Sequence, residues 1–217
     1  MIKENYLKVL KWIKEHKYCL AMLYVPVYLL TFFLTNGLYE PVVWVHHPLD
    51  DLIPFEVNFV IIYMLWFPAI MLALVKVMFR CEKDFKQLAF VMFTGMTISL
   101  IIYAIYPTGL KLRPEIEVNG FSTWLMSMVW KNDVPMNVCP SIHVSSSIAV
   151  FFVAFRGEYL RGQRLKKAAV MIFMIAICVS TVFVKQHSVV DVFYGALLSA
   201  VLYVISEIVC ITKERKA

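Results

Sequence analysis

Two polar residues near the start of the last apolar segment have the types and spacing of a nucleophilic pair. His187 and Asp191 are four residues apart, so on a helix their side chains would be neighbours. The carboxylate could then accept the imidazole N–H, fix the tautomer of the ring and stabilise a positive charge on it. The other ring nitrogen would be free to attack or to take a proton. An aspartate that only caps a helix is the structural alternative.

A second histidine and an arginine suggest that the substrate group is a phosphate. His143 follows Ser141 at the start of another apolar segment, and Arg113 lies in a polar connection. Arginine can bind phosphate through two hydrogen bonds, and the free backbone N–H groups of a helix that starts at Ser141 would favour an oxyanion. One histidine could attack phosphorus while the other protonates the departing oxygen. This set predicts phosphoryl transfer without a metal or any other cofactor.

The composition places these residues in a membrane protein. Of the 217 residues, 61% are hydrophobic and 17% are charged, and the mean hydropathy is +0.73. A soluble domain carries about a quarter charged residues, so an ordinary cytosolic, disordered or fibrous chain is excluded. The five cysteines lack zinc-site spacing and are interpreted as small apolar residues. Only Cys139, which lies beside polar candidates, is left open.

The apolar segments predict an all-α fold, a polytopic membrane protein with a bundle of six transmembrane helices in a single domain over residues 1–217. A bilayer core of about 30 Å needs roughly 20 apolar residues at about 1.5 Å each. The first segment is longer than the apolar part of a signal peptide and lacks a small-residue cleavage pattern, so we expect it to remain as an anchor. The six segments cover residues 18–35, 57–79, 87–106, 142–155, 168–184 and 188–210.

The basic residues predict the orientation of the bundle. Seventeen of the 21 lysines and arginines fall in segments on one side of the membrane, which by the positive-inside rule is the cytoplasm. Both termini are then cytoplasmic, and the polar clusters lie at the outer face of a bacterial-type plasma membrane. Orientation also accounts for the net charge of +6, so no nucleic-acid partner is predicted. The basic residues on the outer side are Lys111, Arg113, Lys131 and Lys185.

Two amphipathic segments outside the spans are expected to lie on the membrane surface. Residues 1–17 combine apolar residues at helical spacing with lysines between them, which predicts a cytoplasmic interfacial helix. The outer connection, about residues 107–140, contains a second apolar stripe with helical spacing. Its members, interpreted as membrane anchors, are Phe121, Trp124, Leu125, Met128 and Val129.

Three short motifs resemble those of the type 2 phosphatidic acid phosphatase superfamily, a group of integral-membrane lipid phosphatases. The resemblance extends over most of the chain, from residue 51 to residue 191. The matching residues are, in chain order, Arg113-Pro114, then Pro140-Ser141-Ile142-His143, and then Ser180 with His187 and Asp191. The superfamily's motifs imply that His187 is phosphorylated, that Asp191 orients it and that His143 acts as the acid. The phosphate-binding residues expected from these motifs are Arg113, Ser141 and Ser180.

This chain departs from the superfamily pattern at three positions. Tyr106 replaces a lysine, Ile142 replaces a glycine and Thr181 replaces an arginine, so two phosphate-binding cations are absent from their usual places. Lys111 lies close to the arginine of the first motif, and Lys185 would follow Thr181 by one helical turn on the same face. Either lysine could restore the charge. For Lys185, a role as an anchor that reaches the membrane surface is an equal alternative.

We therefore expect a lipid phosphate phosphatase that hydrolyses a phosphomonoester or diphosphate headgroup through a phosphohistidine. The segment from His47 to Phe67 and the third motif also resemble the branch that contains the inositol phosphorylceramide and sphingomyelin synthases, so a lipid headgroup phosphotransferase is the alternative. A transporter would place polar residues through the middle of the bilayer, whereas these cluster at one face. The sequence leaves open the lipid, the choice of water or an alcohol as acceptor, and the oligomeric state.

Overall fold

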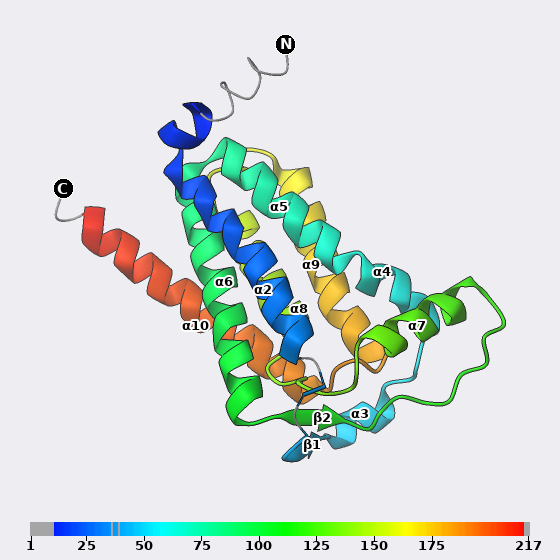
Figure 1. Cartoon of the computed structure of the whole chain (residues 1–217). Helices are drawn as coiled ribbons and strands as arrows, with labels where there is room; N and C mark the ends of the chain where they lie inside the picture. The colour runs from blue at the N-terminus through cyan, green and yellow to red at the C-terminus, as the bar shows by residue number, and fades with distance from the viewer. Residues whose placement is uncertain (1–10, 36, 39, 215–217) are drawn as a thin grey trace, which may run out of the picture.

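Helices account for nearly all of the regular structure in the computed structural model, which describes residues 11–35, 37–38 and 40–214 (Figure 1). Short 3-10 helices, η1 and η2, lead into the first and second long helical segments, and the two strands in the described part have three residues each. The elements are η1 (Lys17–Leu23), α2 (Tyr24–Thr35), β1 (Val43–Val45), α3 (Pro48–Leu52), η2 (Val57–Phe59), α4 (Val60–Met64), α5 (Trp66–Arg80), α6 (Glu82–Ile105), β2 (Thr108–Leu110), α7 (Phe121–Asn132), α8 (Ile142–Arg156), α9 (Arg164–Phe183) and α10 (Val189–Glu214).

Five helical segments of the described chain are long and apolar enough to cross a membrane. They are Lys17–Thr35, Val57–Arg80, Glu82–Ile105, Arg164–Phe183 and Val189–Val209. Helix α8 is apolar as well but has 15 residues, which at about 1.5 Å each fall short of a bilayer core of about 30 Å. The predicted all-α membrane fold is confirmed, and a sixth crossing stays a prediction.

The short helix α8 lies at the centre of the bundle, where it packs against α5, α6, α9 and α10. Its buried residues include Ser145, Ser146 and Ala149. Small side chains allow helices in a membrane to approach one another closely. At Gly195 of α10, any side chain would collide with the backbone of Ser141. This glycine therefore lets α10 lie against the start of α8.

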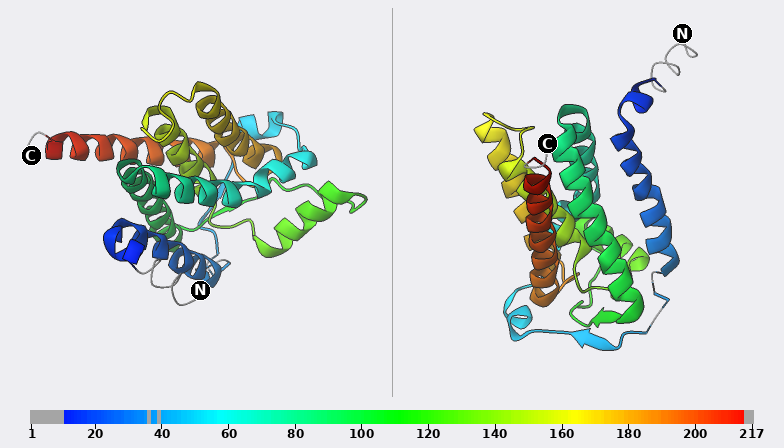
Figure 2. Two further views of the ribbon diagram at one scale, coloured as in Figure 1. Left: turned by 90° about the horizontal axis from the view of Figure 1, so that it is seen from above. Right: turned by 90° about the vertical axis from the view of Figure 1, so that its left-hand side faces the viewer.

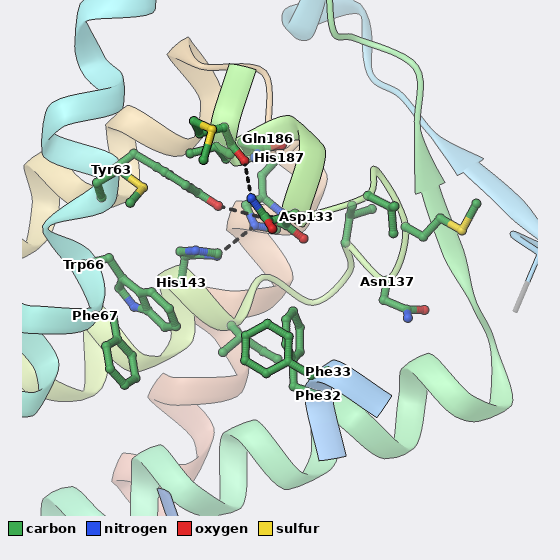
Figure 3. Close-up of a pocket in the computed structure, with 18 of the residues that line it drawn as sticks. Phe32, Phe33, Tyr63, Trp66, Phe67, Asp133, Asn137, His143, Gln186 and His187 are labelled. Atoms are coloured by element: carbon green, nitrogen blue, oxygen red, sulfur yellow. Dashed lines mark hydrogen bonds between the residues drawn. The ribbon is translucent and has the colours of Figure 1, made fainter. Parts of the chain in front are cut away.

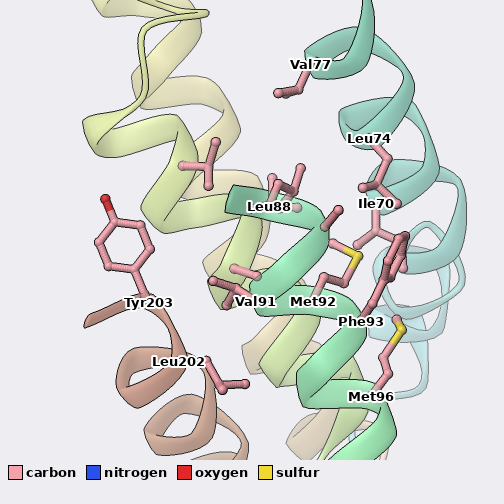
Figure 4. Packing of buried hydrophobic residues seen from close by; sticks show 14 of the residues in the cluster. Ile70, Leu74, Val77, Leu88, Val91, Met92, Phe93, Met96, Leu202 and Tyr203 are labelled. Carbon is pink, nitrogen blue, oxygen red and sulfur yellow. The ribbon is translucent and has the colours of Figure 1, made fainter. Parts of the chain in front are cut away.

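Apolar side chains fill the space between these helices (Figure 4). Ile70 and Leu74 of α5 point toward Leu88 and Met92 of α6, and Leu202 of α10 belongs to the same buried cluster. Protein interiors packed in this way have little free volume and resist rearrangement. The core thus fixes the helices relative to one another, as a site built from several helices requires.

The long connections gather at one end of the bundle. The start of η1 and the end of α10 lie at the opposite end from α3, α7 and the two strands (Figures 1 and 2). There β1 and β2 pair in parallel, with Val43 opposite Thr108 and Val45 opposite Leu110. The connection after α2 is thereby joined to the connection after α6. Which side of the membrane this end faces stays a prediction.

The two predicted surface helices have different outcomes. Residues 1–10 of the first lie outside the described part of the chain, and residues 11–15 are helical. The second is a helix, α7, but two residues of the predicted stripe, Leu125 and Val129, pack against the protein. Met126 and Val129 pack in one buried cluster with Val60 and Tyr63, whereas Phe121 is 66% exposed. The location of α7 at the membrane surface stays a prediction.

We predict that the end of the bundle carrying α7 faces outward, because the basic residues concentrate at the other end. A cysteine placed at the exposed Asn119 should react with a membrane-impermeant thiol reagent in intact cells. A cysteine at the exposed Arg161, in the turn between α8 and α9, should react only after the cells are permeabilised. Both variants would be made in a chain whose native cysteines are replaced by alanine. The reverse pattern of labelling would place this end in the cytoplasm.

Candidate active site

Two histidines from separate parts of the chain meet at the end of the bundle that carries the long connections (Figure 3). His143 is the second residue of α8, and His187 lies in the turn between α9 and α10. Nε2 of His187 is 3.3 Å from Nδ1 of His143, and their ring centres are 5.4 Å apart. The structure thus brings together two candidate residues that are 44 positions apart in the chain.

His187 and Asp191 are also in contact, although they do not share a helix as expected. Helix α10 begins at Val189, so His187 precedes it. Nδ1 of His187 is 3.4 Å from the Asp191 carboxylate. The same carboxylate accepts the backbone N–H of Ser188 at 2.8 Å, as an acidic residue at the third helical position does in a capping box. Asp191 therefore contacts both the helix N-terminus and the histidine.

Cys139 lies next to Asp191. Burial and the neighbouring carboxylate raise the pKa of the Cys139 thiol to about 12. The thiol is therefore protonated at neutral pH, and a protonated thiol is a poor nucleophile and a poor metal ligand. In the described part of the chain, no group of three or more His, Cys, Asp or Glu residues is arranged to hold a metal ion.

Aromatic side chains hold the ring of His143. Tyr63 of α4 stacks on it with ring centres 4.7 Å apart, and Trp66 of α5 packs against it at 4.1 Å. The indole is fixed in turn, because its Nε1 donates to the Ser146 hydroxyl at 2.8 Å. Neither aromatic residue was singled out from the sequence, since both lie about 80 positions from His143 and no local pattern links them. A ring held in this way stays in one place, as a positioned proton donor must.

Arg113 reaches the same place from the loop after β2. Its Nη2 donates to the backbone carbonyl of Asp133 at 2.9 Å and to Oε1 of Gln186. Its guanidinium lies 5.7 Å from the centre of the Trp130 ring. Burial lowers the pKa of Arg113. Burial also raises the pKa of the Asp133 carboxyl, and the nearby guanidinium offsets part of that rise. The ordinary pKa of arginine lies far above neutral pH, so the guanidinium keeps its charge there.

The four other residues expected to bind phosphate, Lys111, Ser141, Ser180 and Lys185, do not line the cavity that contains the histidines. Lys111 is exposed and extends over the Trp44 ring, with its Nζ 4.1 Å from the ring centre. Ser141 caps α8, where its hydroxyl accepts the N–H of Val144 at 3.3 Å. Ser180 is buried in α9 and donates to a carbonyl of its own helix at 2.7 Å. These serines shape the helices around the histidines.

Lys185 holds the turn between α9 and α10 to α3. The expectation that it follows Thr181 on one helical face is wrong, because α9 ends at Phe183 and Lys185 has a positive φ of 55°. Its Nζ donates to the carbonyls of Asp50 and Ile53, at 2.6 and 2.5 Å. The side chain is buried and does not line the cavity.

Asp50 of α3 is a fully buried carboxylate that the sequence did not reveal as part of the site. It accepts the hydroxyl of Ser188 at 2.6 Å and the backbone N–H of Val189 at 2.8 Å, so it caps α10 from 139 positions away. It also accepts the N–H of His47 at 2.8 Å and thereby caps α3. From the sequence alone, an acidic residue after a proline at a helix start is explained by the local cap of α3. The sequence therefore gives no sign that Asp50 also caps α10.

A cavity of about 660 Å³ extends from the histidines toward the apolar part of the bundle (Figure 3). Its polar end is formed by the two histidines with Arg113, Asp133 and Gln186. The remaining lining comes mainly from apolar side chains of α2, α4, α5 and α7, among them Phe32, Phe33, Phe67, Trp124 and Leu125. This volume is typical of a small-molecule site. The division matches a ligand with one charged end and an apolar remainder.

The fold and the site together define an integral-membrane helical protein with a histidine, aspartate and arginine centre. Residues 86–213, more than half of the chain, match the family model described as the PAP2 superfamily, and the chain belongs to that superfamily. The matched region contains both histidines, Asp191 and Arg113. Searches of curated proteins and of solved structures gave no match. Membership supports a phosphatase or phosphotransferase type of activity on phosphate esters.

We predict that Asp50→Ala lowers the stability of the detergent-solubilised protein much more than Asp51→Ala does. The first change leaves the buried Ser188 hydroxyl and two partly buried backbone N–H groups without their acceptor, which costs about 3 kcal/mol or more. The second removes an exposed contact with His46, and exposed ion pairs contribute little. The measurement is the free energy of unfolding or the melting temperature. Equal stability of the two variants would contradict the assigned role of Asp50.

Proposed function

We propose that this protein is a metal-independent phosphatase for lipid phosphates, with its active site at the outer face of a bacterial-type plasma membrane. The observation that carries the proposal is the 3.3 Å contact between His187 Nε2 and His143 Nδ1 at the polar end of a largely apolar cavity. Two imidazoles so close together can serve the same phosphoryl group, one as nucleophile and one as acid.

In the first step, Nε2 of His187 attacks phosphorus and the bond from phosphorus to the lipid oxygen breaks. The departing oxygen takes a proton from His143. Asp191 accepts the N–H at Nδ1 of His187, which leaves the lone pair of Nε2 free and stabilises the positive charge that forms on the ring. Arg113 neutralises charge on the phosphoryl oxygens.

In the second step, water attacks the phosphohistidine. His143, which lost its proton in the first step, takes one from the attacking water. The bond between phosphorus and Nε2 of His187 breaks, and phosphate is released. Two imidazoles and a guanidinium supply the nucleophile, the acid and the neutralising charge, so the proposed reaction needs no metal ion.

The apolar part of the cavity supports a lipid as the substrate. Phe32 and Phe33 of α2, together with Phe67 of α5, lie on the side of the cavity away from Gln186 and His187 (Figure 3). Transfer of an apolar tail to such a surface is favourable, whereas the phosphate needs the polar end. Phosphatidic acid, phosphatidylglycerol phosphate and a polyprenyl diphosphate all have this division.

Transfer of a headgroup to an alcohol is the second candidate, and the number of cations favours it. Among the described residues that line the cavity, Arg113 is the single lysine or arginine. Lys111 and Lys185 have other contacts, and the Asp133 carboxyl offsets part of the guanidinium charge. A phosphodiester carries one negative charge, whereas a phosphomonoester carries close to two at neutral pH. In this reaction His187 would take the phosphoryl group with its headgroup attached and pass it to an alcohol.

We expect the purified protein to release free phosphate from at least one member of a panel of lipid phosphates in the presence of excess chelator. The panel contains phosphatidic acid, phosphatidylglycerol phosphate and a polyprenyl diphosphate. A parallel reaction supplies a phosphodiester lipid with a long-chain alcohol. A new headgroup-bearing lipid without free phosphate would favour the transferase instead. Activity that returns only with Mg²⁺ or Zn²⁺ would contradict the proposed mechanism.

Replacement of each histidine should have a different effect on phosphoenzyme formation, because one is proposed as the nucleophile and the other as the acid. His187→Ala should form no acid-labile phosphoenzyme with any substrate. His143→Ala should still be phosphorylated by an activated aryl phosphate, whose leaving group needs no proton, but not by a lipid phosphate. Asp191→Asn should fold, but its rate of phosphohistidine formation should fall by up to roughly 10⁴-fold. The amide neither stabilises the imidazolium nor fixes the tautomer of His187.

Rapid-quench trapping of the phosphoenzyme in these three variants is the measurement. A phosphoenzyme in His187→Ala would show that another residue is the nucleophile. Equal loss with good and poor leaving groups in His143→Ala would show that this histidine is not the acid.

A further inference from the structure

Gln186 is a buried amide at the polar end of the cavity, one residue before His187. It is 3% exposed and lines the cavity with the two histidines (Figure 3). Its Oε1 accepts a hydrogen bond from Nη2 of Arg113. A guanidinium has only donors, so the amide oxygen must face Arg113 and the amide nitrogen must point elsewhere.

Two buried donors of the bonded Arg113 and Gln186 side chains form no hydrogen bond in the described structure. They are Nε2 of Gln186 and Nε of Arg113. The Tyr63 hydroxyl lies next to the amide and donates to the Asp133 carboxylate at 3.4 Å, but its oxygen accepts no hydrogen bond from Nε2 of Gln186. Buried donors nearly always have a partner, so an unpaired couple of them indicates a place for a ligand with acceptor atoms. A phosphoryl group, with several oxygens around one phosphorus, can accept from both.

The residues that replace the two missing cations do not reach the cavity, so a phosphoryl group there needs other hydrogen-bond donors. Tyr106, at the usual lysine position, is 49% exposed, and the Thr181 hydroxyl, at the usual arginine position, donates to the carbonyl of Cys178 at 2.7 Å. Neither residue lines the cavity. Binding of a phosphoryl group beside a single guanidinium therefore leaves oxygens that need further donors. A neutral amide supplies one without adding a charge next to Arg113.

We propose that Gln186 binds the phosphoryl group directly through Nε2, while its Oε1 orients the Arg113 guanidinium. This role deepens the proposed function and rests on it, because it names a further group that recognises the substrate phosphate. It also makes Gln186, which lies inside the third motif but is not one of its matching residues, a determinant of phosphate affinity in this chain.

A purely positioning role for Gln186 is the alternative, and two substitutions distinguish the two roles. Gln186→Glu keeps an acceptor for Arg113 but removes the donor and adds a negative charge. Gln186→Met keeps the length of the side chain and removes both the acceptor and the donor. If Gln186 binds phosphate, the Glu variant should have the lower phosphate affinity. If Gln186 only orients Arg113, the Met variant should have the lower phosphate affinity.

The experiment measures how inorganic phosphate raises the melting temperature of the detergent-solubilised protein, and how orthovanadate inhibits aryl phosphate hydrolysis. We expect both changes at Gln186 to lower the affinity for phosphate and for vanadate by roughly tenfold to hundredfold, as for a lost hydrogen bond to a charged group. The Glu variant should bind both anions more weakly than the Met variant. Gln163→Met, in the turn at the opposite end of the bundle, is the control and should behave like the wild type. Each variant is compared with its own melting temperature without phosphate, so a loss of stability does not imitate a loss of binding.

Three results would overturn the inference. One is near-normal phosphate affinity in Gln186→Glu combined with a loss in Gln186→Met, which would make the residue a positioning group. Another is unchanged affinity in both variants. The third is a wild-type protein that phosphate does not stabilise. A wild type that phosphate stabilises in a Gln186-dependent manner, but that hydrolyses no phosphate ester, would support the anion site and refute the proposed function alone.

Discussion

The site depends on two buried charged residues that hold the turn between α9 and α10. The first N–H groups of a helix have no partner within it, and inside a membrane protein no bulk water replaces one. Asp50 meets this need by accepting hydrogen bonds from Ser188 and Val189, and Lys185 donates in the opposite direction to carbonyls at α3. His187 lies between these fixed points. Its position is therefore set by a segment more than 130 residues earlier in the chain.

The use of Lys185 in this turn has a chemical consequence for the cavity. An ammonium near the histidines would add to the charge of Arg113, but this ammonium is directed at backbone carbonyls instead. The neighbours of the guanidinium include the uncharged Gln186 amide and the Asp133 carboxyl, whose charge is opposite to that of the guanidinium. The charge available to a phosphate is accordingly small, and hydrogen-bond donors gain importance over cations. Under the proposed function, discrimination between phosphate groups of different charge would depend on a few side chains around Arg113.

Local patterns in the sequence predicted much of this fold, and contacts between distant segments account for the rest. Apolar length predicted the helices, and the distribution of basic residues predicted that the histidines and the arginine share one end, where the structure brings them together. Asp50, Tyr63 and Gln186 could not be assigned, because their partners lie 73 to 139 residues away in the chain. The position of Lys185 was predicted wrongly, because α9 ends at Phe183 and the Lys185 ammonium donates to carbonyls of residues distant in the chain.

The two ends of the cavity differ in how deeply their elements are buried, and under the proposed function this difference bears on how a lipid would use the cavity. Its polar end rests on the starts of α8 and α10, which are capped and buried in the core. Its apolar walls include α2, where Tyr28 is the single buried residue of the helix, and α7, with two buried residues. Elements with few buried contacts open at low free energy. A substrate could therefore keep its tail in the bilayer and pass these walls, while its phosphate reaches histidines whose geometry does not change.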